Sequence, residues 1–379
     1  MHTIIVLGAG MVGSTMAFDL SKNHQVTLTD ISEERLQRLT DKNSNITYQV
    51  LDVCDRLQLQ KTILPFDLVV CAVPGFLGYE TVKNIIEAGK HVVDISFFPE
   101  DALQLDALAK ANNVTAIVDC GVAPGMGNFI LGRYNQLMEI TDFECLVGGL
   151  PKIKKWPFAY KAPFSPVDVI EEYTRPARYV ENGKLITRDA LSDCEFVQFD
   201  EVGTLESFNS DGLRSIIFTM PHIRNMKEKT LRYPGHIEYI KVLKESGFFD
   251  TKPLHVKGVS ISPLDFTSSI LFNEWKLGET EPELTIMRIS ITGVNRKGDK
   301  EKIVYDLYDE YDPISQTSSM ARTTGYTATA AANMFLNGLF ESRGIFPPEL
   351  IGHDENCFQF ILQYLAERKV HYKKSTFIL

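Results

Sequence analysis

The sequence predicts an α/β protein in which a doubly wound parallel sheet is interrupted by a second, α+β domain. Three observations support this fold class. A β-branched run at the N-terminus leads through a glycine-rich turn into a helical pattern, and short apolar strands then alternate with helices over the first third of the chain. The middle of the chain changes to longer strands of alternating polarity. We expect a first domain of residues 1–122 completed by 320–379, and a second domain of residues 123–319.

The first predicted element is TIIVLGAGMVGSTMAFDL, which reads as a strand, a turn and a helix. Gly8, Gly10 and Gly13 give the pattern G-x-G-x-x-G in the context that a dinucleotide site requires. The first glycine permits a tight turn, the second lets the backbone approach a pyrophosphate, and the third lets helix and strand pack closely. Met11 and Val12 begin the helix whose N-terminus would bind the phosphates. The pattern indicates a Rossmann-type domain, with a purely structural glycine turn as the alternative.

The second predicted strand, QVTLTD, ends at Asp30, 20 residues beyond Gly10. A carboxylate at this position would bind the ribose hydroxyls of the adenosine and repel a 2′-phosphate. The sequence therefore favours NAD as the cofactor over NADP. Arg35 lies five residues further on and is the one feature that argues for NADP.

Four more strands are expected, and each is followed by a loop at the edge of the sheet where doubly wound folds bind ligands. The strands are ITYQVLDVCD, FDLVVCAVPGF, HVVDIS and VTAIVDCGVAPG, and the helical segments YETVKNIIEAGK and PEDALQLDALAKANN lie between them. The loop residues expected to face the cofactor are Asp52, Ala72, Val73, Pro74, Asp94, Asp119 and Gly125. For each of the three aspartates, a role as a helix cap or an ordinary loop residue is the alternative.

The pattern changes after APGMGN. The strand TDFECLVGGLPK precedes a long segment rich in proline and aromatic residues, and the strands ELTIMRISITGV and EKIVYDLYDEYD flank the turn NRKGDK as a hairpin. A helix, SPLDFTSSILFNEW, begins at Ser262 or Pro263. We therefore expect a mixed or antiparallel sheet with few helices. The helix in SQTSSMARTTGYTATAAANMFLNGLF, which is rich in small residues, then returns the chain to the first domain.

Composition argues against several classes of function. The formal net charge of −10 disfavours a nucleic-acid surface. The six cysteines form neither a C-x-x-C pair nor a Cys/His cluster, which predicts reduced thiols and no metal site. The chain enters a strand at once, without a signal peptide, and no stretch approaches the ~18 apolar residues of a membrane span. We expect a cytoplasmic protein that binds neither membranes nor nucleic acid.

Six motifs occur together in the order found in one enzyme family. They are the N-terminal G-x-G-x-x-G, DCGVAPGMGN, VGGLP, TLRYPGH, ARTTGYTATAAA and RGIFPPE. On these motifs the sequence resembles the saccharopine reductase-like family over nearly its whole length, and within that family the lysine dehydrogenases. The resemblance implies a Rossmann domain interrupted by a domain that contacts substrate and forms the interface of a homodimer. It also implies an enzyme that interconverts NAD(P)H with C–N bonds of lysine-derived amino acids.

The resemblance further implies which residues contact the substrate. The T-L-R stretch of the family falls on Thr230, Leu231 and Arg232, and another substrate arginine falls, with a looser alignment, on Arg214. Ala123 departs from the saccharopine reductases, which typically carry an aspartate in this loop, and agrees with the lysine dehydrogenases. This departure disfavours saccharopine as the substrate without excluding it.

The stretch TLRYPGH is the expected floor of the active site. Arg232 would bind the substrate α-carboxylate as a bidentate pair. His236 would transfer a proton near neutral pH, and Asp94 and Asp119 are the other candidates for that role. The alternative is a turn stabilised by an Arg-Tyr pair, with His236 as a hydrogen-bonded core residue.

These expectations converge on an NAD-dependent oxidoreductase that acts on a C–N bond of a lysine-type amino acid. The leading reaction is the oxidative deamination of the ε-amine of L-lysine. Saccharopine and carboxynorspermidine dehydrogenases, from the same family, are the close alternatives. An NADH-binding sensor without turnover is a remoter one, since a fold alone does not decide function.

Overall fold

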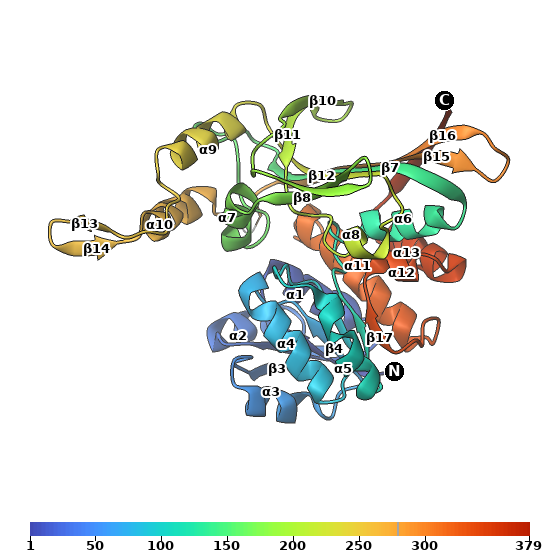
Figure 1. Ribbon diagram of the computed structural model, residues 1–379. Helices are drawn as coiled ribbons and strands as arrows, with labels where there is room; N and C mark the ends of the chain where they lie inside the picture. Colours follow the sequence, from blue (N-terminus) through green and yellow to red (C-terminus); the bar gives the residue numbers. More distant parts are fainter. Residues whose placement is uncertain (279) are drawn as a thin grey trace.

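The computed structural model describes residues 1–278 and 280–379 and has two lobes, each built around its own sheet (Figure 1). The first lobe contains a parallel sheet with the strand order β17-β6-β5-β4-β1-β2-β3. Its strands are β1 (Thr3–Leu7), β2 (Gln25–Asp30), β3 (Ile46–Val50), β4 (Leu68–Cys71), β5 (Val92–Asp94), β6 (Thr115–Ile117) and β17 (Gly344–Phe346). The predicted doubly wound fold class is confirmed.

Both faces of the parallel sheet are covered, which explains why its strands are apolar throughout. Along β1, Ile4 and Val6 pack into one hydrophobic cluster, whereas Ile5 and Leu7 pack into another. The helices of the first lobe and the helical connection to β7 are α1 (Met11–Leu20), α2 (Glu33–Lys42), α3 (Arg56–Ile63), α4 (Gly75–Glu87), the short 3₁₀ helix η1 (Ala102–Leu105), α5 (Asp106–Ala111) and α6 (Met126–Asn135).

The second lobe contains a mixed sheet, as predicted. Its main order is β10-β11-β12-β7-β15-β16-β18, and β8 pairs with both β12 and β9. The pair β12–β7 is parallel and its neighbours are antiparallel. The strands are β7 (Met138–Pro151), β8 (Ala177–Glu181), β9 (Lys184–Arg188), β10 (Glu195–Phe199), β11 (Gly203–Asn209), β12 (Asn225–Arg232), β15 (Glu283–Asn295), β16 (Lys300–Glu310) and β18 (Tyr372–Ile378).

The stretch TLRYPGH spans the end of a strand and the start of a helix. Arg232 ends β12, and His236 begins α9 (His236–Glu245) after Gly235, which has a φ of 94°. The other helices of this lobe are α7 (Pro166–Thr174), α8 (Ile216–Thr219) and α10 (Pro263–Trp275). The hairpin of β13 (Leu254–Val256) and β14 (Val259–Ile261) projects from the lobe beyond α10 (Figure 1).

The C-terminal segment contributes to both lobes. Its helices are α11 (Ser319–Leu336), α12 (Pro348–Ile351) and α13 (Glu355–Glu367). β17 joins the parallel sheet, whereas β18 pairs with β16 of the second sheet. Small residues let α11 approach α1, because a Cβ built on Gly325 would already lie 3.3 Å from Met16 Cγ. Within the described residues, every helix is too short or too polar to span a membrane.

Candidate active site

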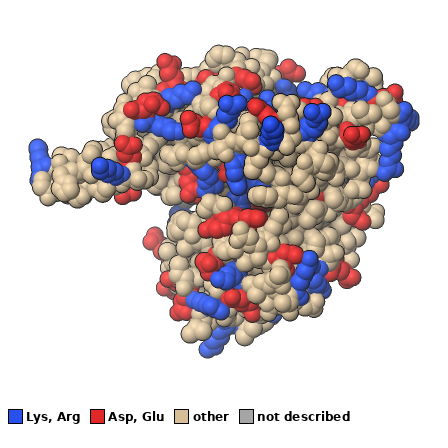
Figure 2. Space-filling model, in the orientation of Figure 1, with Lys and Arg blue, Asp and Glu red and all other residues tan. Residues whose placement is uncertain are grey.

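A cavity of about 1460 Å³ lies between the two lobes. The first lobe contributes the loops at the carboxyl ends of its strands, and the second contributes residues of β7, α7, β12 and α10. The volume exceeds the ≈300–1,000 Å³ of a typical small-ligand pocket, so it has room for a dinucleotide and a second molecule. Acidic and basic side chains meet in the hollow between the lobes (Figure 2).

The glycine-rich turn has the geometry expected of a pyrophosphate site. Gly10 caps α1 with extended backbone (φ −70°, ψ −174°), and a Cβ built on it would meet nothing within 4 Å. A Cβ on Gly13 would instead lie 2.0 Å from the carbonyl oxygen of Gly8. Gly10 thus leaves the first turn of α1 open to the cavity, and Gly13 allows the close packing behind it. These residues fit a bound dinucleotide.

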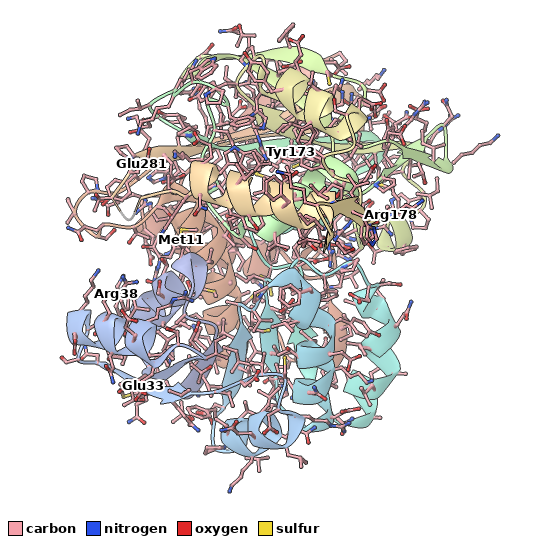
Figure 3. The ribbon with its side chains drawn as sticks, turned by 90° about the vertical axis from the view of Figure 1, so that its left-hand side faces the viewer. Met11, Glu33, Arg38, Tyr173, Arg178 and Glu281 are labelled. Atoms are coloured by element: carbon pink, nitrogen blue, oxygen red, sulfur yellow. The ribbon has the colours of Figure 1, made fainter. Side chains whose placement is uncertain are left out.

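Ten of the twelve predicted cofactor residues line the cavity. They are Gly8, Gly10, Met11, Val12, Gly13, Asp30, Asp52, Ala72, Val73 and Pro74. Figure 3 shows Met11 at the upper edge of the first lobe, with Tyr173 and Glu281 in the second lobe above it.

Asp30, at the end of β2, is held in place by the backbone. Its carboxylate accepts hydrogen bonds from the N–H groups of Ala9 (2.9 Å) and Ser32 (3.0 Å). Arg35 Nη1 lies 3.4 Å from the same carboxylate. The carboxylate is therefore oriented before any ligand binds, and Arg35 partly balances its charge.

Two further basic residues line the cavity and were not expected. Arg38 and Lys42 of α2 join Arg35 in the lining (Figure 3 labels Arg38). The three residues are spaced by three and four positions, which places them on one helix face. That spacing was the available sequence signal for a basic surface beside Asp30.

The remaining two predicted cofactor residues lie behind the cavity wall. Asp94 is fully buried, and its carboxylate accepts hydrogen bonds from the backbone N–H (3.2 Å) and the hydroxyl of Ser96. Burial raises the pKa of Asp94 to about 7. Gly125 caps α6 with a φ of 145°, and a Cβ there would overlap Gly121. Ser96, rather than Asp94, reaches the cavity lining.

Asp119 lines the cavity, but it is already paired. Arg214 Nε donates to Asp119 Oδ1 at 2.7 Å, and a second guanidinium N–H donates to the carbonyl of Phe98. Burial raises the pKa of Asp119, and the charge of Arg214 opposes this shift. Arg214 does not line the main cavity, so the structure places this predicted substrate residue as the partner of Asp119.

Alternate residues of β12 face the cavity. Thr230 and Arg232 line it as predicted, and Glu228 lines it as well. Side chains two apart on a strand point to the same face, so these three form one row. Leu231 points to the opposite face and is fully buried in a hydrophobic cluster, which contradicts the expected substrate contact. The same alternation, applied to EKTLR, could have identified Glu228 from the sequence.

The guanidinium of Arg232 is largely occupied by groups of the protein itself. Nη2 donates to Glu172 at 2.7 Å, Nε donates to the hydroxyl of Tyr173 at 3.0 Å, and Nη1 donates to the carbonyl of Leu231 at 3.0 Å. Arg232 is only 2% exposed. A substrate carboxylate would therefore have to share this arginine with Glu172.

His236 does not have the position of a proton-transfer group. Its Nε2 accepts from the hydroxyl of Tyr173 at 2.9 Å, and its Nδ1 lies 2.9 Å from the carbonyl of Phe158, to which it donates. Burial, followed by the charge of Arg232, lowers the pKa of His236 to about 3. The ring is absent from the cavity lining and stays neutral near pH 7. The structure thus corrects this prediction in favour of a hydrogen-bonded core residue.

Carboxylates dominate the part of the lining that the second lobe contributes. The acidic residues there are Asp168, Glu171, Glu172, Asp211, Glu228 and Glu281, against the basic residues Arg175, Arg232 and Lys276. Four of the acids have ion-pair partners, in the pairs Glu171–Arg175, Glu172–Arg232, Asp211–Arg178 and Glu281–Lys155. Within residues 1–278 and 280–379, Asp168 and Glu228 have none. This wall therefore favours a cationic ligand.

Comparisons with family models cover most of the chain. Residues 4–117 match the saccharopine dehydrogenase NADP binding domain, and residues 121–370 match the saccharopine dehydrogenase C-terminal domain. The first match ends before Asp119 and the second begins at Gly121, so the boundary between them falls in a loop that lines the cavity.

Two curated relatives illustrate the similarity in sequence. The mitochondrial alpha-aminoadipic semialdehyde synthase of Mus musculus is 23% identical, with 91% of this chain and 45% of the relative covered. The chain thus spans about half the length of that relative. The saccharopine dehydrogenase (NADP(+), L-glutamate-forming) of Pyricularia oryzae is 22% identical, with 91% of this chain and 93% of the relative covered.

Solved structures show the same fold. An apo saccharopine dehydrogenase (L-Glu forming) from Saccharomyces cerevisiae superposes with a TM-score of 0.81 at 19% identity, and the match covers 100% of both chains. A homospermidine synthase from Legionella pneumophila, solved in complex with NAD, gives a TM-score of 0.66 at 14% identity, covering 100% of this chain and 91% of the other. At these identities the likeness concerns the fold.

Proposed function

Because the chain belongs to the saccharopine dehydrogenase family, we propose that it is an NAD-dependent oxidoreductase acting on a C–N bond of a lysine-type amino acid. Oxidative deamination of the L-lysine ε-amine is the reaction we place first. The observation that carries this choice is the excess of carboxylates on the wall that the second lobe contributes to the cavity. The homodimer implied by the family resemblance stays a prediction, which light scattering of the purified protein would test.

The first lobe would hold the cofactor. The open backbone at Gly10 and the N-terminus of α1 suit a pyrophosphate, and Asp30 suits the adenosine ribose. When bound, the nicotinamide supplies the oxidant by accepting a hydride from the carbon that bears the amine. The loop Ala72–Pro74 and the residues Ile95–Phe97 line the remainder of this half of the cavity.

The charge of the second lobe favours lysine over saccharopine. L-lysine carries two ammonium groups and one carboxylate, whereas saccharopine carries three carboxylates. Asp168 and Glu228 have no ion-pair partners among the described residues, so each can pair with an ammonium group of L-lysine, and neither can pair with a carboxylate of saccharopine. Ala123, at the position where saccharopine reductases typically carry an aspartate, also lines the cavity. These observations support a substrate with more amines than carboxylates.

Cofactor choice is a separate part of the proposal. One relative named above, the saccharopine dehydrogenase of Pyricularia oryzae, is NADP(+)-dependent by its name, and Arg35, Arg38 and Lys42 provide basic charge beside Asp30. We nevertheless place NAD first, because the carboxylate of Asp30 is fixed by two backbone N–H groups and would repel a 2′-phosphate.

Substitution of Asp30 tests the preference for NAD over NADP. We expect wild-type protein to bind NADH at least about tenfold more tightly than NADPH, which corresponds to ~1.4 kcal/mol. Asp30→Ser should remove the repulsion and free Arg35, and so narrow or reverse the ratio. Fluorescence titrations with both reduced cofactors measure it. Equal affinities in the wild-type protein would contradict the preference.

A substrate panel tests the reaction. Formation of NADH would be followed with L-lysine, L-ornithine, L-saccharopine and carboxynorspermidine as substrates. We expect the highest kcat/KM with L-lysine. Turnover of saccharopine or carboxynorspermidine alone would replace the substrate while keeping the reaction class. Tight NADH binding without turnover of any of the four would favour a sensor and overturn the enzymatic proposal.

A further inference from the structure

Glu228 is a buried carboxyl group that points into the cavity without a partner. It is 7% exposed and lies in the same row of β12 as Thr230 and Arg232. Among the described residues, its carboxyl makes no hydrogen bond or ion pair. A Cβ built on Gly212 would lie 1.7 Å from Glu228 Oε1, so the chain leaves space for this carboxyl by having no side chain at Gly212.

The charged groups that face Glu228 come from three other parts of the fold. Glu172 belongs to α7, Asp211 and Arg214 lie in the loop between β11 and α8, and Asp119 follows β6. Three of these four groups are acidic, and each acid is already paired with an arginine. Among these acidic groups, Glu228 is therefore the one whose carboxyl is available to bind a ligand.

The position suits contact with the reacting end of a substrate. Asp119 and the loop of Gly121 to Pro124, at the carboxyl end of the parallel sheet, line the same cavity. Ligands of doubly wound sheets bind at this edge. Glu228 lines this cavity too, so its carboxyl and the loops of the first lobe border the same space.

We propose that Glu228 accepts the proton of the substrate's reacting ammonium group, which makes it a catalytic residue that contacts the substrate. The inference rests on the proposed amine dehydrogenase function. In the step, an N–H bond of the ammonium breaks and an O–H bond of the carboxyl forms. A carboxylate and an ammonium become a carboxylic acid and a neutral amine, and no other reactant is needed. The freed lone pair on nitrogen is what a carbon needs in order to lose a hydride.

The protonation state of free Glu228 agrees with this role. Burial, followed by the charges of Glu172, Asp211 and Asp119, raises its pKa to about 8, and Arg214 opposes the shift. At pH 7 the free carboxyl is mostly protonated. The complex holds one proton fewer than the separate carboxylic acid and ammonium group. It is either a carboxylate beside an ammonium group or a carboxylic acid beside a neutral amine. Binding of a protonated amine at pH 7 therefore releases about one proton to the buffer.

Calorimetry of L-lysine binding to the protein–NADH complex tests the inference without any turnover. Titrations at pH 7 in buffers of different ionisation enthalpy give the number of protons released. We expect about one for wild-type protein and none for Glu228→Gln, an isosteric neutral variant. L-norleucine, which lacks the ε-amine, should release none from either protein. Equal proton release by wild-type protein and Glu228→Gln would overturn the inference.

A matched control is available on the same sheet. Glu144 of β7 forms an ion pair with Lys227 at 2.9 Å and does not line the cavity. Glu144→Gln makes the same substitution on the same sheet but outside the cavity, and it should leave proton release unchanged. A second variant, Gly212→Ala, would displace the Glu228 carboxyl without changing any charge, and should also suppress the release.

Steady-state kinetics separates this inference from the proposed function. Wild-type kcat/KM should rise with pH as the carboxyl of free Glu228 loses its proton, and Glu228→Gln should lower kcat/KM ~10²–10⁴-fold and remove that rise. Unaltered kinetics in Glu228→Gln would overturn the inference and leave the function standing. Proton release that depends on Glu228, without oxidation of any amine, would overturn the function and keep the ammonium site.

Discussion

The two halves of the cavity are built in different ways. In the first lobe the backbone forms the site: Gly10 exposes the start of α1, and two N–H groups orient Asp30. In the second lobe side chains form it, because Arg232 of β12 pairs with Glu172 of α7 and Glu228 of β12 lines the same cavity. A backbone site needs a few consecutive residues, whereas a side-chain site needs the tertiary fold. The first half is therefore readable from one motif and the second is not.

The halves also differ in their electrostatics. Asp168 and Glu228 of the second lobe are buried without ion-pair partners among the described residues, and burial raises the pKa of Asp168 to about 6 and that of Glu228 to about 8. Groups whose pKa values are shifted toward neutrality are able to exchange protons under ordinary conditions. The chemistry of proton transfer is thus expected in the second lobe, and the binding of the dinucleotide in the first.

The largest expected effect concerns Arg232, which lines the second half of the cavity and also forms an ion pair with Glu172. If its charge balances Glu172, then Arg232→Ala leaves the carboxylate of Glu172, whose side chain is only 19% exposed, without its partner. We expect this variant to lose about 3–5 kcal/mol of unfolding free energy. Chemical denaturation monitored by circular dichroism would measure the loss.

A second substitution distinguishes structural balance from substrate binding. Adding Glu172→Gln to Arg232→Met removes both charges and should restore much of the stability, since buried pairs are replaceable by neutral residues. Substrate affinity should stay low if Arg232 also contacts the carboxylate. A stable Arg232→Ala variant that binds substrate poorly would instead show that the guanidinium is reserved for the ligand.

The next effect separates two glycines of the first half. Gly13→Ala places a Cβ 2.0 Å from the carbonyl of Gly8, so we expect a loss of about 3 kcal/mol or more, seen as a lower Tm. Gly10→Ala meets no atom of the protein and should change stability by less than ~0.5 kcal/mol. It should nevertheless weaken NADH binding at least about tenfold, because its methyl group occupies the approach of the pyrophosphate. Equal NADH affinity in Gly10→Ala and wild-type protein would argue that the pyrophosphate binds elsewhere.

The elements formed by local backbone patterns could be predicted from the sequence, whereas the side-chain half of the cavity could be predicted only in part. The parallel sheet, the mixed sheet and the glycine-rich turn were predicted from local patterns, and the structure confirms them. Glu228 lies outside the T-L-R stretch, and only the period of two along β12 places it on the same face as Thr230 and Arg232. β18 was missed because its exposed, charged residues carry little strand signal before they pair with β16.

The error at His236 has a different physical origin. The chemistry of a histidine depends on its neighbours, and here these are aromatic residues distant in sequence. The rings of Tyr160, Tyr173 and Trp275 lie within 6.0 Å of the His236 ring, measured between centroids. They remove water from the imidazole and so lower its affinity for a proton. The residues of TLRYPGH alone do not predict that His236 is surrounded by aromatic rings.

The smallest expected effect tests this correction. His236→Asn keeps a donor for the Phe158 carbonyl and loses the bond from Tyr173, so we expect a loss of about 1–3 kcal/mol in unfolding free energy. The kcat profile near neutral pH should keep its shape, because the ring has a pKa of about 3 and is already neutral there. The folded-state pKa lies below the unfolded value of about 6.5, so the unfolded state binds more protons between these pH values. Wild-type protein should therefore lose its stability advantage over His236→Asn as the pH falls from 6.5 toward 3, measured as the difference in Tm. A titration step near pH 6.5 in the kcat profile of wild-type protein that disappears in His236→Asn would return the proton-transfer role to this histidine.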